Sequence, residues 1–116
     1  MRKIRILIFG PSAFLAAEVR VAWHQAGVEL IGPFGSLAEW VTTPKEHADG
    51  AVIDLDFDTA TLIELTDALD EASIPSRFAT SSAVRPGYGG FELSASLEAI
   101  NAILRALLSP EDSATH

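Results

Sequence analysis

No cysteine occurs among the 116 residues of the chain, so disulfide bonds, thiolate nucleophiles and cysteine-ligated zinc sites are excluded. Positive charge is also scarce, because 8 lysines and arginines stand against 16 aspartates and glutamates. The basic residues are scattered along the chain and form no stripe. This composition argues against direct nucleic-acid binding, and the net charge of −8 favours solubility and protein partners.

Long hydrophobic runs are absent as well. No apolar stretch approaches the roughly 20 residues that cross a bilayer. The opening MRKIRILIFG has a charged start but only a short apolar run and no cleavage site, so it does not resemble a signal peptide. We therefore expect a cytoplasmic protein that does not associate with membranes. Apolar residues still make up 48% of the chain, which is enough to build the core of one domain.

Strand and helix patterns alternate along the chain. Ser36-Leu37-Ala38-Glu39 has the pattern of a capping box, and Asp58 and Ser96 can cap later helices. Gly32-Pro33 is expected to end the second strand. Apolar runs predict strands at residues 3–9, 29–31, 51–54, 77–80 and 91–94, and helical spacing predicts helices within residues 13–26, 36–43, 58–72 and 96–108.

This alternation predicts an α/β fold with a parallel sheet covered by helices on both faces. A flavodoxin-like, doubly wound sheet of five strands in the order 2-1-3-4-5 is the expected architecture. The interval 81–90 holds three glycines and a proline, so a loop is expected where this fold normally has its fourth helix. We expect one domain over residues 1–108 and a flexible tail over residues 109–116.

In such a fold, ligands bind beyond the carboxyl ends of the first and third strands. Those ends are Gly10-Pro11-Ser12 and Asp54-Leu55-Asp56. A glycine turn before a helix can bind phosphate, but this turn has one glycine and neither common phosphate-binding pattern, and Pro11 removes one backbone N–H. A nucleotide site is therefore disfavoured, and a small-ligand-binding α/β domain stays as an alternative.

Five stretches, in order, resemble a response-regulator receiver domain. They are RILIFGPSAF (5–14), GVELIGPFGSLAEW (27–40), ADGAVIDLDF (48–57), IPSRFATS (74–81) and LSASLEAI (93–100), and the resemblance runs from about residue 4 to residue 108. Phe78-Ala79-Thr80 and the glycine-rich interval that follows resemble one subgroup, the FATGUY single-domain receivers of stress-signalling phosphorelays. Ser81-Ser82 departs from that subgroup, which has a glycine there.

The resemblance implies a role for each matching position. Asp54 takes the place of the phosphoryl-accepting aspartate, while Thr80 and Phe91 take the places of the switch hydroxyl and the switch aromatic. Gly10 and Pro11 stand where the family has its magnesium-binding acidic pair, and Leu93 stands where it has a lysine. Without the resemblance, Asp54, Thr80 and Phe91 would be read as an exposed strand-end carboxylate, a locally bonded hydroxyl and a buried strand aromatic.

The resemblance therefore implies a degenerate receiver without a cofactor. Asp56 is the nearby carboxylate that could join Asp54 in weak magnesium binding. We expect a non-enzymatic signalling protein that binds a histidine kinase, another signalling protein or a second copy of itself without being phosphorylated. The alternatives are a working phosphorelay receiver, phosphorylated on Asp54 with Mg²⁺ by a histidine kinase, and the small-ligand-binding domain.

Overall fold

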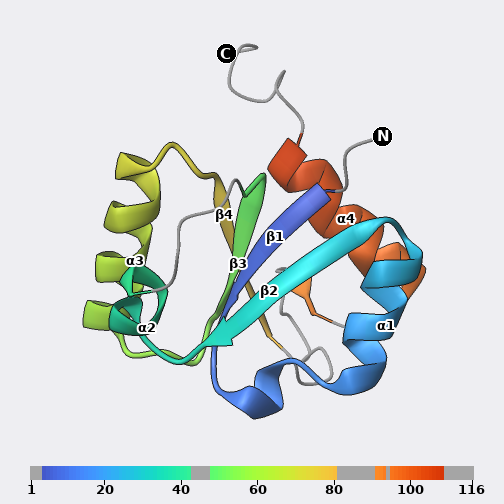
Figure 1. The fold of residues 1–116 in the computed structure, drawn as a ribbon, viewed down its shortest axis with the longest axis horizontal. Coiled ribbons are helices and arrows are strands. Elements are labelled where there is room, and N and C mark those ends of the chain that lie inside the picture. The colour runs from blue at the N-terminus through green and yellow to red at the C-terminus, as the bar shows by residue number, and fades with distance from the viewer. Residues whose placement is uncertain (1–3, 43–47, 81–90, 94, 109–116) are drawn as a thin grey trace.

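The computed structural model describes residues 4–42, 48–80, 91–93 and 95–108. The loop expected at residues 81–90 and the tail expected at residues 109–116 lie outside these ranges. A twisted sheet runs through the middle of the molecule, with helices α2 and α3 on one side and α1 and α4 on the other (Figure 1). The predicted α/β class is confirmed.

The elements have the following bounds. The strands are β1 (Ile4–Phe9), β2 (Val28–Phe34), β3 (Gly50–Asp54), β4 (Ser76–Thr80) and β5 (Phe91–Glu92). The helices are the 3₁₀ turn η1 (Ser12–Phe14), α1 (Ala17–Gln25), α2 (Leu37–Val41), α3 (Thr59–Glu71) and α4 (Leu97–Leu108).

The first four strands form a parallel sheet in the order β2-β1-β3-β4. The two-residue β5 pairs in parallel with the end of β4, where Ala79 lies opposite Phe91. In the middle of the sheet, Leu7 of β1 lies between Ile31 of β2 and Ala51 of β3. All these strands run in one direction, so their carboxyl ends meet at one edge of the sheet.

Each face of the sheet carries its own apolar core, because successive strand side chains point to opposite faces. Ile6 and Ile8 pack with Trp23 of α1 and Ile103 of α4 in one core. The core on the other face contains Leu7, Phe9 and Ile53, together with Trp40 of α2 and Leu65 and Leu69 of α3. Both tryptophans are buried.

Two predicted boundaries are wrong. β2 does not end at Gly32-Pro33 but continues to Phe34. Between Leu7 and Phe9 of β1, the pairing on β2 moves from Ile31 to Phe34, so β2 accommodates one extra residue as a bulge. A proline is tolerated there because β2 is an edge strand, whose outer backbone groups need no partner strand.

The first helix also starts later than predicted. The chain makes the short turn η1, passes through Leu15 and Ala16 in extended conformation, and begins α1 at Ala17. Phe14 and Leu15, which the helical pattern included, instead turn into the core, with 2% and 7% of their surface exposed. Leu97 at the start of α4 is 63% exposed, so it adds little to the buried apolar face of that helix.

Residues 4–42, 48–80, 91–93 and 95–108 include no helix that is long and apolar enough to cross a membrane.

The outer edge of β2 is covered by Arg20 of α1. Its guanidinium donates one hydrogen bond to the Leu30 carbonyl at 2.9 Å and another to the Gly32 carbonyl at 2.6 Å. The next residue, Pro33, has no N–H to offer. A strand from another molecule would need these backbone groups, so Arg20 and Pro33 close this edge against strand pairing.

We predict that Arg20→Met, which keeps a long apolar side chain but removes both donors, self-associates through the freed edge. Light scattering after gel filtration should give a mean mass above that of the wild type, and the excess should grow with protein concentration. Arg105→Met is the matched control, because Arg105 lies exposed on α4. A mass equal to that of the wild type at every concentration would show that Arg20 does not protect this edge.

Candidate functional site

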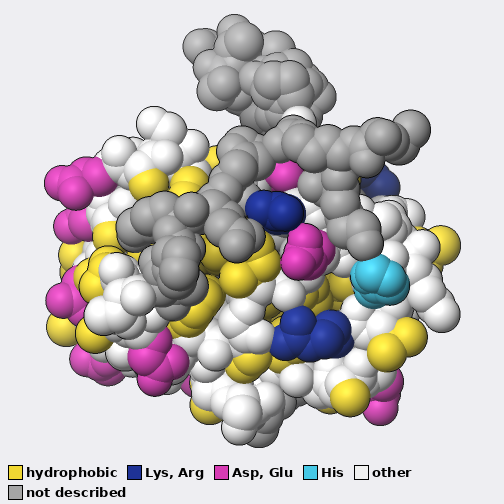
Figure 2. All heavy atoms as spheres, in the orientation of Figure 1, with side chains coloured by type: hydrophobic (Ala, Val, Ile, Leu, Met, Phe, Trp, Pro, Cys, Tyr) yellow, Lys and Arg dark blue, Asp and Glu magenta, His cyan; other side chains and the backbone are white. Residues whose placement is uncertain are grey.

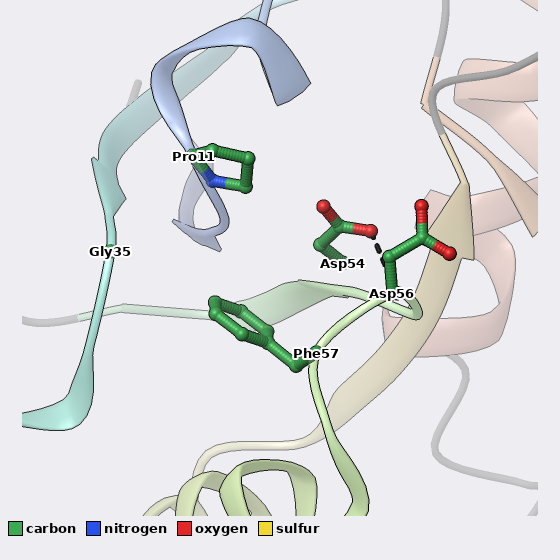
Figure 3. Close-up of a pocket in the computed structure, with 5 residues that line it drawn as sticks. All are labelled: Pro11, Gly35, Asp54, Asp56 and Phe57. Atoms are coloured by element: carbon green, nitrogen blue, oxygen red, sulfur yellow. Dashed lines mark hydrogen bonds between the residues drawn. The ribbon is translucent and has the colours of Figure 1, made fainter.

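The carboxyl ends of the strands open into a pocket of about 360 Å³. Pro11 follows β1, Gly35 follows β2, and Asp54, Asp56 and Phe57 come from the end of β3 and the turn after it (Figure 3). The sequence predicted that the turns after the first and third strands would meet, and the structure confirms that they share this pocket.

Asp54 lies on the wall of the pocket and is only 7% exposed. One of its carboxylate oxygens, Oδ1, accepts a hydrogen bond of 2.9 Å from the Asp56 backbone N–H. The Leu55 N–H donates to the Ala79 carbonyl of β4 at 2.9 Å, which ties the turn to the neighbouring strand. The Asp54 side chain is therefore fixed in place, and it is not the exposed strand-end carboxylate of the simpler interpretation.

The pKa of Asp54 is raised above the usual value for an aspartate. The main cause is burial, because loss of water penalises the charged form. The backbone hydrogen bond from Asp56 lowers the pKa, and the negative charge of Asp56 raises it again. Asp54 thus lies in an environment that does little to stabilise its charge.

The turn after β1 brings no ionisable group to the pocket. The Gly10 N–H donates to the Phe34 carbonyl at 2.8 Å, which anchors the turn to the end of β2. A Cβ on Gly10 would lie 2.6 Å from the ring of the buried Phe14, so Gly10 cannot be replaced by a side chain unless Phe14 moves. Pro11 is exposed at the rim, its side chain has no ligand atom, and its backbone has no N–H.

Thr80 ends β4, Phe91 begins β5 and Leu93 follows β5, and none of them lines the pocket. Thr80 ends β4, is 6% exposed, and follows Ala79, which is paired with Asp54. Its carbonyl accepts a hydrogen bond of 2.9 Å from the Leu93 N–H. Leu93 and the partly buried Phe91 pack in the core beneath α1 and α4.

Two pocket residues, Gly35 and Phe57, were not predicted. The capping box of α2 holds Gly35, because its N–H donates to Glu39 Oε1 at 2.8 Å while the Glu39 N–H donates to Ser36 Oγ at 3.3 Å. Phe57 lies in the turn after β3, and its N–H donates to the Asp54 carbonyl at 3.3 Å. Both residues could have been found from their positions in the turns that follow β2 and β3.

The pocket fits a magnesium ion poorly. Mg²⁺ requires an octahedral set of oxygen ligands, usually with one or two carboxylates. Within the residues that the structure describes, no group of three or more histidine, aspartate and glutamate side chains could hold a metal ion. Asp54 and Asp56 are the two carboxylates at the pocket, and the turn after β1 adds none.

Comparison with known proteins gives no relative, since no family model matches the chain and no curated protein matches it.

We predict that Asp54→Asn raises the free energy of unfolding at pH 7 by up to about 1 kcal/mol. The folded-state pKa of Asp54 lies above that of the unfolded chain, so its ionisation opposes folding. This loss of stability is absent below the pKa of Asp54 in the unfolded chain, which is near 4. It grows as the pH rises towards the pKa of Asp54 in the folded chain, and it is complete above that pKa. The asparagine oxygen can still accept the bond from Asp56.

Urea denaturation at several pH values measures this effect, and the gain should shrink as the pH falls towards about 4. Asp56→Asn is the control, because this exposed residue contributes repulsion but no desolvation, and it should give a smaller gain. A loss of stability in Asp54→Asn at pH 7 would mean that the charge of Asp54 is stabilised rather than strained.

Proposed function

We propose that this chain is an atypical response-regulator receiver with the flavodoxin-like fold, in which β5 completes a five-stranded sheet of order 2-1-3-4-5. It acts by binding another protein without being phosphorylated, and it is not an enzyme. The observation that carries the proposal is the position of Asp54, a buried carboxylate at the end of β3 that shares a pocket with the turn after β1.

The helices on both faces of the sheet support the proposed flavodoxin-like fold. The order β2-β1-β3-β4 places β1 and β3 side by side, and their carboxyl ends form the crevice where ligands bind in such sheets. Asp54 thus stands at the phosphoacceptor position, Thr80 at the end of the adjacent strand at the switch position, and Phe91 at the position of the switch aromatic.

The charges around Asp54 support the view that phosphorylation has been lost. A phosphoryl group brings close to two negative charges into the pocket at neutral pH. Two like charges about 4 Å apart repel by about 4 kcal/mol at the partly screened surface of a protein. Gly10 and Pro11 supply no magnesium ligand to offset this repulsion, and Leu93 packs in the core where the family has a lysine.

The acidic surface favours a partner with basic side chains. Figure 2 shows acidic side chains spread over the side of the molecule formed by α2 and α3. Glu64, Asp67, Asp70 and Glu71 of α3 are all exposed. We propose a histidine kinase or another cytoplasmic signalling protein as the partner. A second copy of the chain is the alternative, and it would pair along β5, because Arg20 closes the β2 edge.

Two other functions are each favoured by one observation. The buried Asp54 favours a phosphorelay receiver that a histidine kinase phosphorylates with the help of Mg²⁺. The open pocket of about 360 Å³ favours a domain that binds a small ligand.

We predict that incubation with acetyl phosphate and Mg²⁺ leaves the intact mass of the chain unchanged. Among the described residues that line the pocket, no positively charged side chain is present to compensate the charge that phosphoryl transfer brings to Asp54. Asp54→Asn is the control, because any mass gain that this variant still shows must arise at another residue. A gain of one phosphoryl group per chain that disappears in Asp54→Asn would establish the phosphorelay receiver in place of the proposed function.

A further inference from the structure

The middle of β4 presents an aromatic ring that the described helices leave partly open. Phe78 lies opposite Ile53 in the β3–β4 pair, so both side chains point to the face that α2 and α3 cover (Figure 1). Ile53 is completely buried there, whereas Phe78 is 38% exposed. β4 is an inner strand of a parallel sheet, and such strands are normally covered on both faces. Phe78 therefore marks a part of the sheet that α3 does not fully cover.

One side of α3 adjoins this part of the sheet. Thr59, Ile63, Thr66 and Asp70 follow one another at helical spacing and form a stripe along α3. Because the crossover from β3 through α3 to β4 is right-handed, this stripe lies on the side of α3 that faces β4. Ile63 is 56% exposed. The Thr66 hydroxyl donates to the Leu62 carbonyl at 2.9 Å, which leaves its methyl group for contact. We call Phe78 together with this stripe the β4–α3 surface.

The charge beside the β4–α3 surface has one sign. Every charged residue of α3 is acidic, and all four are exposed: Glu64, Asp67, Asp70 and Glu71. The neighbouring base Arg77 does not offset them, because its guanidinium donates to the Ala106 carbonyl of α4 on the other face of the sheet. An occupant of this surface therefore needs apolar side chains for Phe78 and Ile63 and a basic side chain for Asp70.

We propose that the β4–α3 surface binds an amphipathic helix of a partner protein, with lysine or arginine beside its apolar stripe. A helix packed beside α3 would lie about 8–10 Å from it and would cover Phe78 from the same layer. A partner strand does not fit, because β4 is already paired with β3 and β5. This inference rests on the proposed function, since it names the surface and the kind of segment through which the partner is bound.

A synthetic helical peptide of about 18 residues serves as the probe, since shorter helices are marginal in water. It carries a leucine stripe flanked by lysines. One control peptide has glutamate in place of each lysine, and a second has the same composition with the leucines moved off the stripe. Each is titrated into the isotopically labelled chain at about 150 mM salt, which screens non-specific attraction. The probe should shift the backbone amide signals of Ile63, Thr66 and Phe78 in a saturable way.

The control peptides separate the two features of the probe. The glutamate peptide should produce no saturable shift, because the charges of α3 repel it. The peptide without a leucine stripe should bind several-fold more weakly than the probe. Equal binding of either control, or shifts of the probe that map to α1 and α4, would overturn the inference.

Variants of the chain test the apolar contacts. Phe78→Thr, which keeps a residue suited to a strand, should weaken the probe about tenfold. Ile63→Gln should weaken it several-fold, and this variant keeps the test valid if Phe78→Thr disturbs the core. Val21→Gln is the matched control, because Val21 is 54% exposed on α1 at the other face of the sheet. Equal weakening by Val21→Gln and Ile63→Gln would overturn the inference.

The charged contact has its own pair of variants. Asp70→Asn should weaken the probe about threefold, as expected for an exposed ion pair. Glu98→Gln changes the net charge equally but lies exposed on α4, and it should leave the affinity unchanged. Equal weakening by both variants would show that the net charge attracts the probe and would overturn the role of Asp70.

A second copy of the chain is the other occupant that the test distinguishes. Light scattering of the chain alone should give the same mass for the wild type, Phe78→Thr and Ile63→Gln. A dimer that these two variants dissociate, and that Val21→Gln leaves intact, would overturn the inference in favour of self-association.

This test and the phosphorylation test fail separately. Absence of peptide binding with no phosphorylation would leave a partner-binding receiver that uses another surface. Phosphorylation of Asp54 together with peptide binding would overturn the proposed function while the preference of the β4–α3 surface for a basic helix stands.

Discussion

The hydrogen bond between the Asp56 N–H and the Asp54 carboxylate is the contact around which the site is organised. It fixes the buried side chain at the end of β3 and leaves one oxygen facing the pocket. The bond from the Leu55 N–H to Ala79 holds the same turn against β4, and the bond from the Gly10 N–H to Phe34 holds the facing turn against β2. The two facing turns are thus positioned by hydrogen bonds that their backbone N–H groups donate.

The negative charge at the pocket determines which chemical groups it can accept. Desolvation and the neighbouring Asp56 both work against ionised Asp54, and the pKa is raised as a result. A further negative group beside Asp54 is unfavourable here. This repulsion is the physical basis for proposing partner binding in place of phosphoryl transfer.

Much of this arrangement could be predicted from the sequence. Apolar runs separated by capped helices gave the α/β class, the parallel pairing and the order of the first four strands, because these follow from periodicity and from the handedness of crossovers. The meeting of Pro11 with Asp54 and Asp56 followed from the same topology. The burial of Asp54 could not be predicted, since aspartates are mostly exposed and only the neighbouring segments of the fold cover this one.

Features that are set by tertiary packing were not predicted from the sequence. Phe14 leaves the expected helix to fill the space beside Gly10, and its own helical spacing gave no sign of this. Nothing in the sequence indicates that Arg20 donates hydrogen bonds to two carbonyls of β2. Gly32-Pro33 signalled a break, yet an edge strand with a bulge could include both residues. In each case a contact between distant segments overrode the local pattern.

The lack of a magnesium site at Asp54 is the central claim, and a comparison of two chains in a Mg²⁺ titration tests it most directly. Gly10 has no room for a carboxylate, but the exposed Pro11 lies at the rim, and an aspartate suits its position before η1. In the wild type, Mg²⁺ should cause no saturable shift of the backbone amide signals of Leu55, Asp56 and Phe57. In Pro11→Asp the same amides should shift and saturate. Saturable binding of Mg²⁺ to the wild type, lost in Asp54→Asn, would contradict the account.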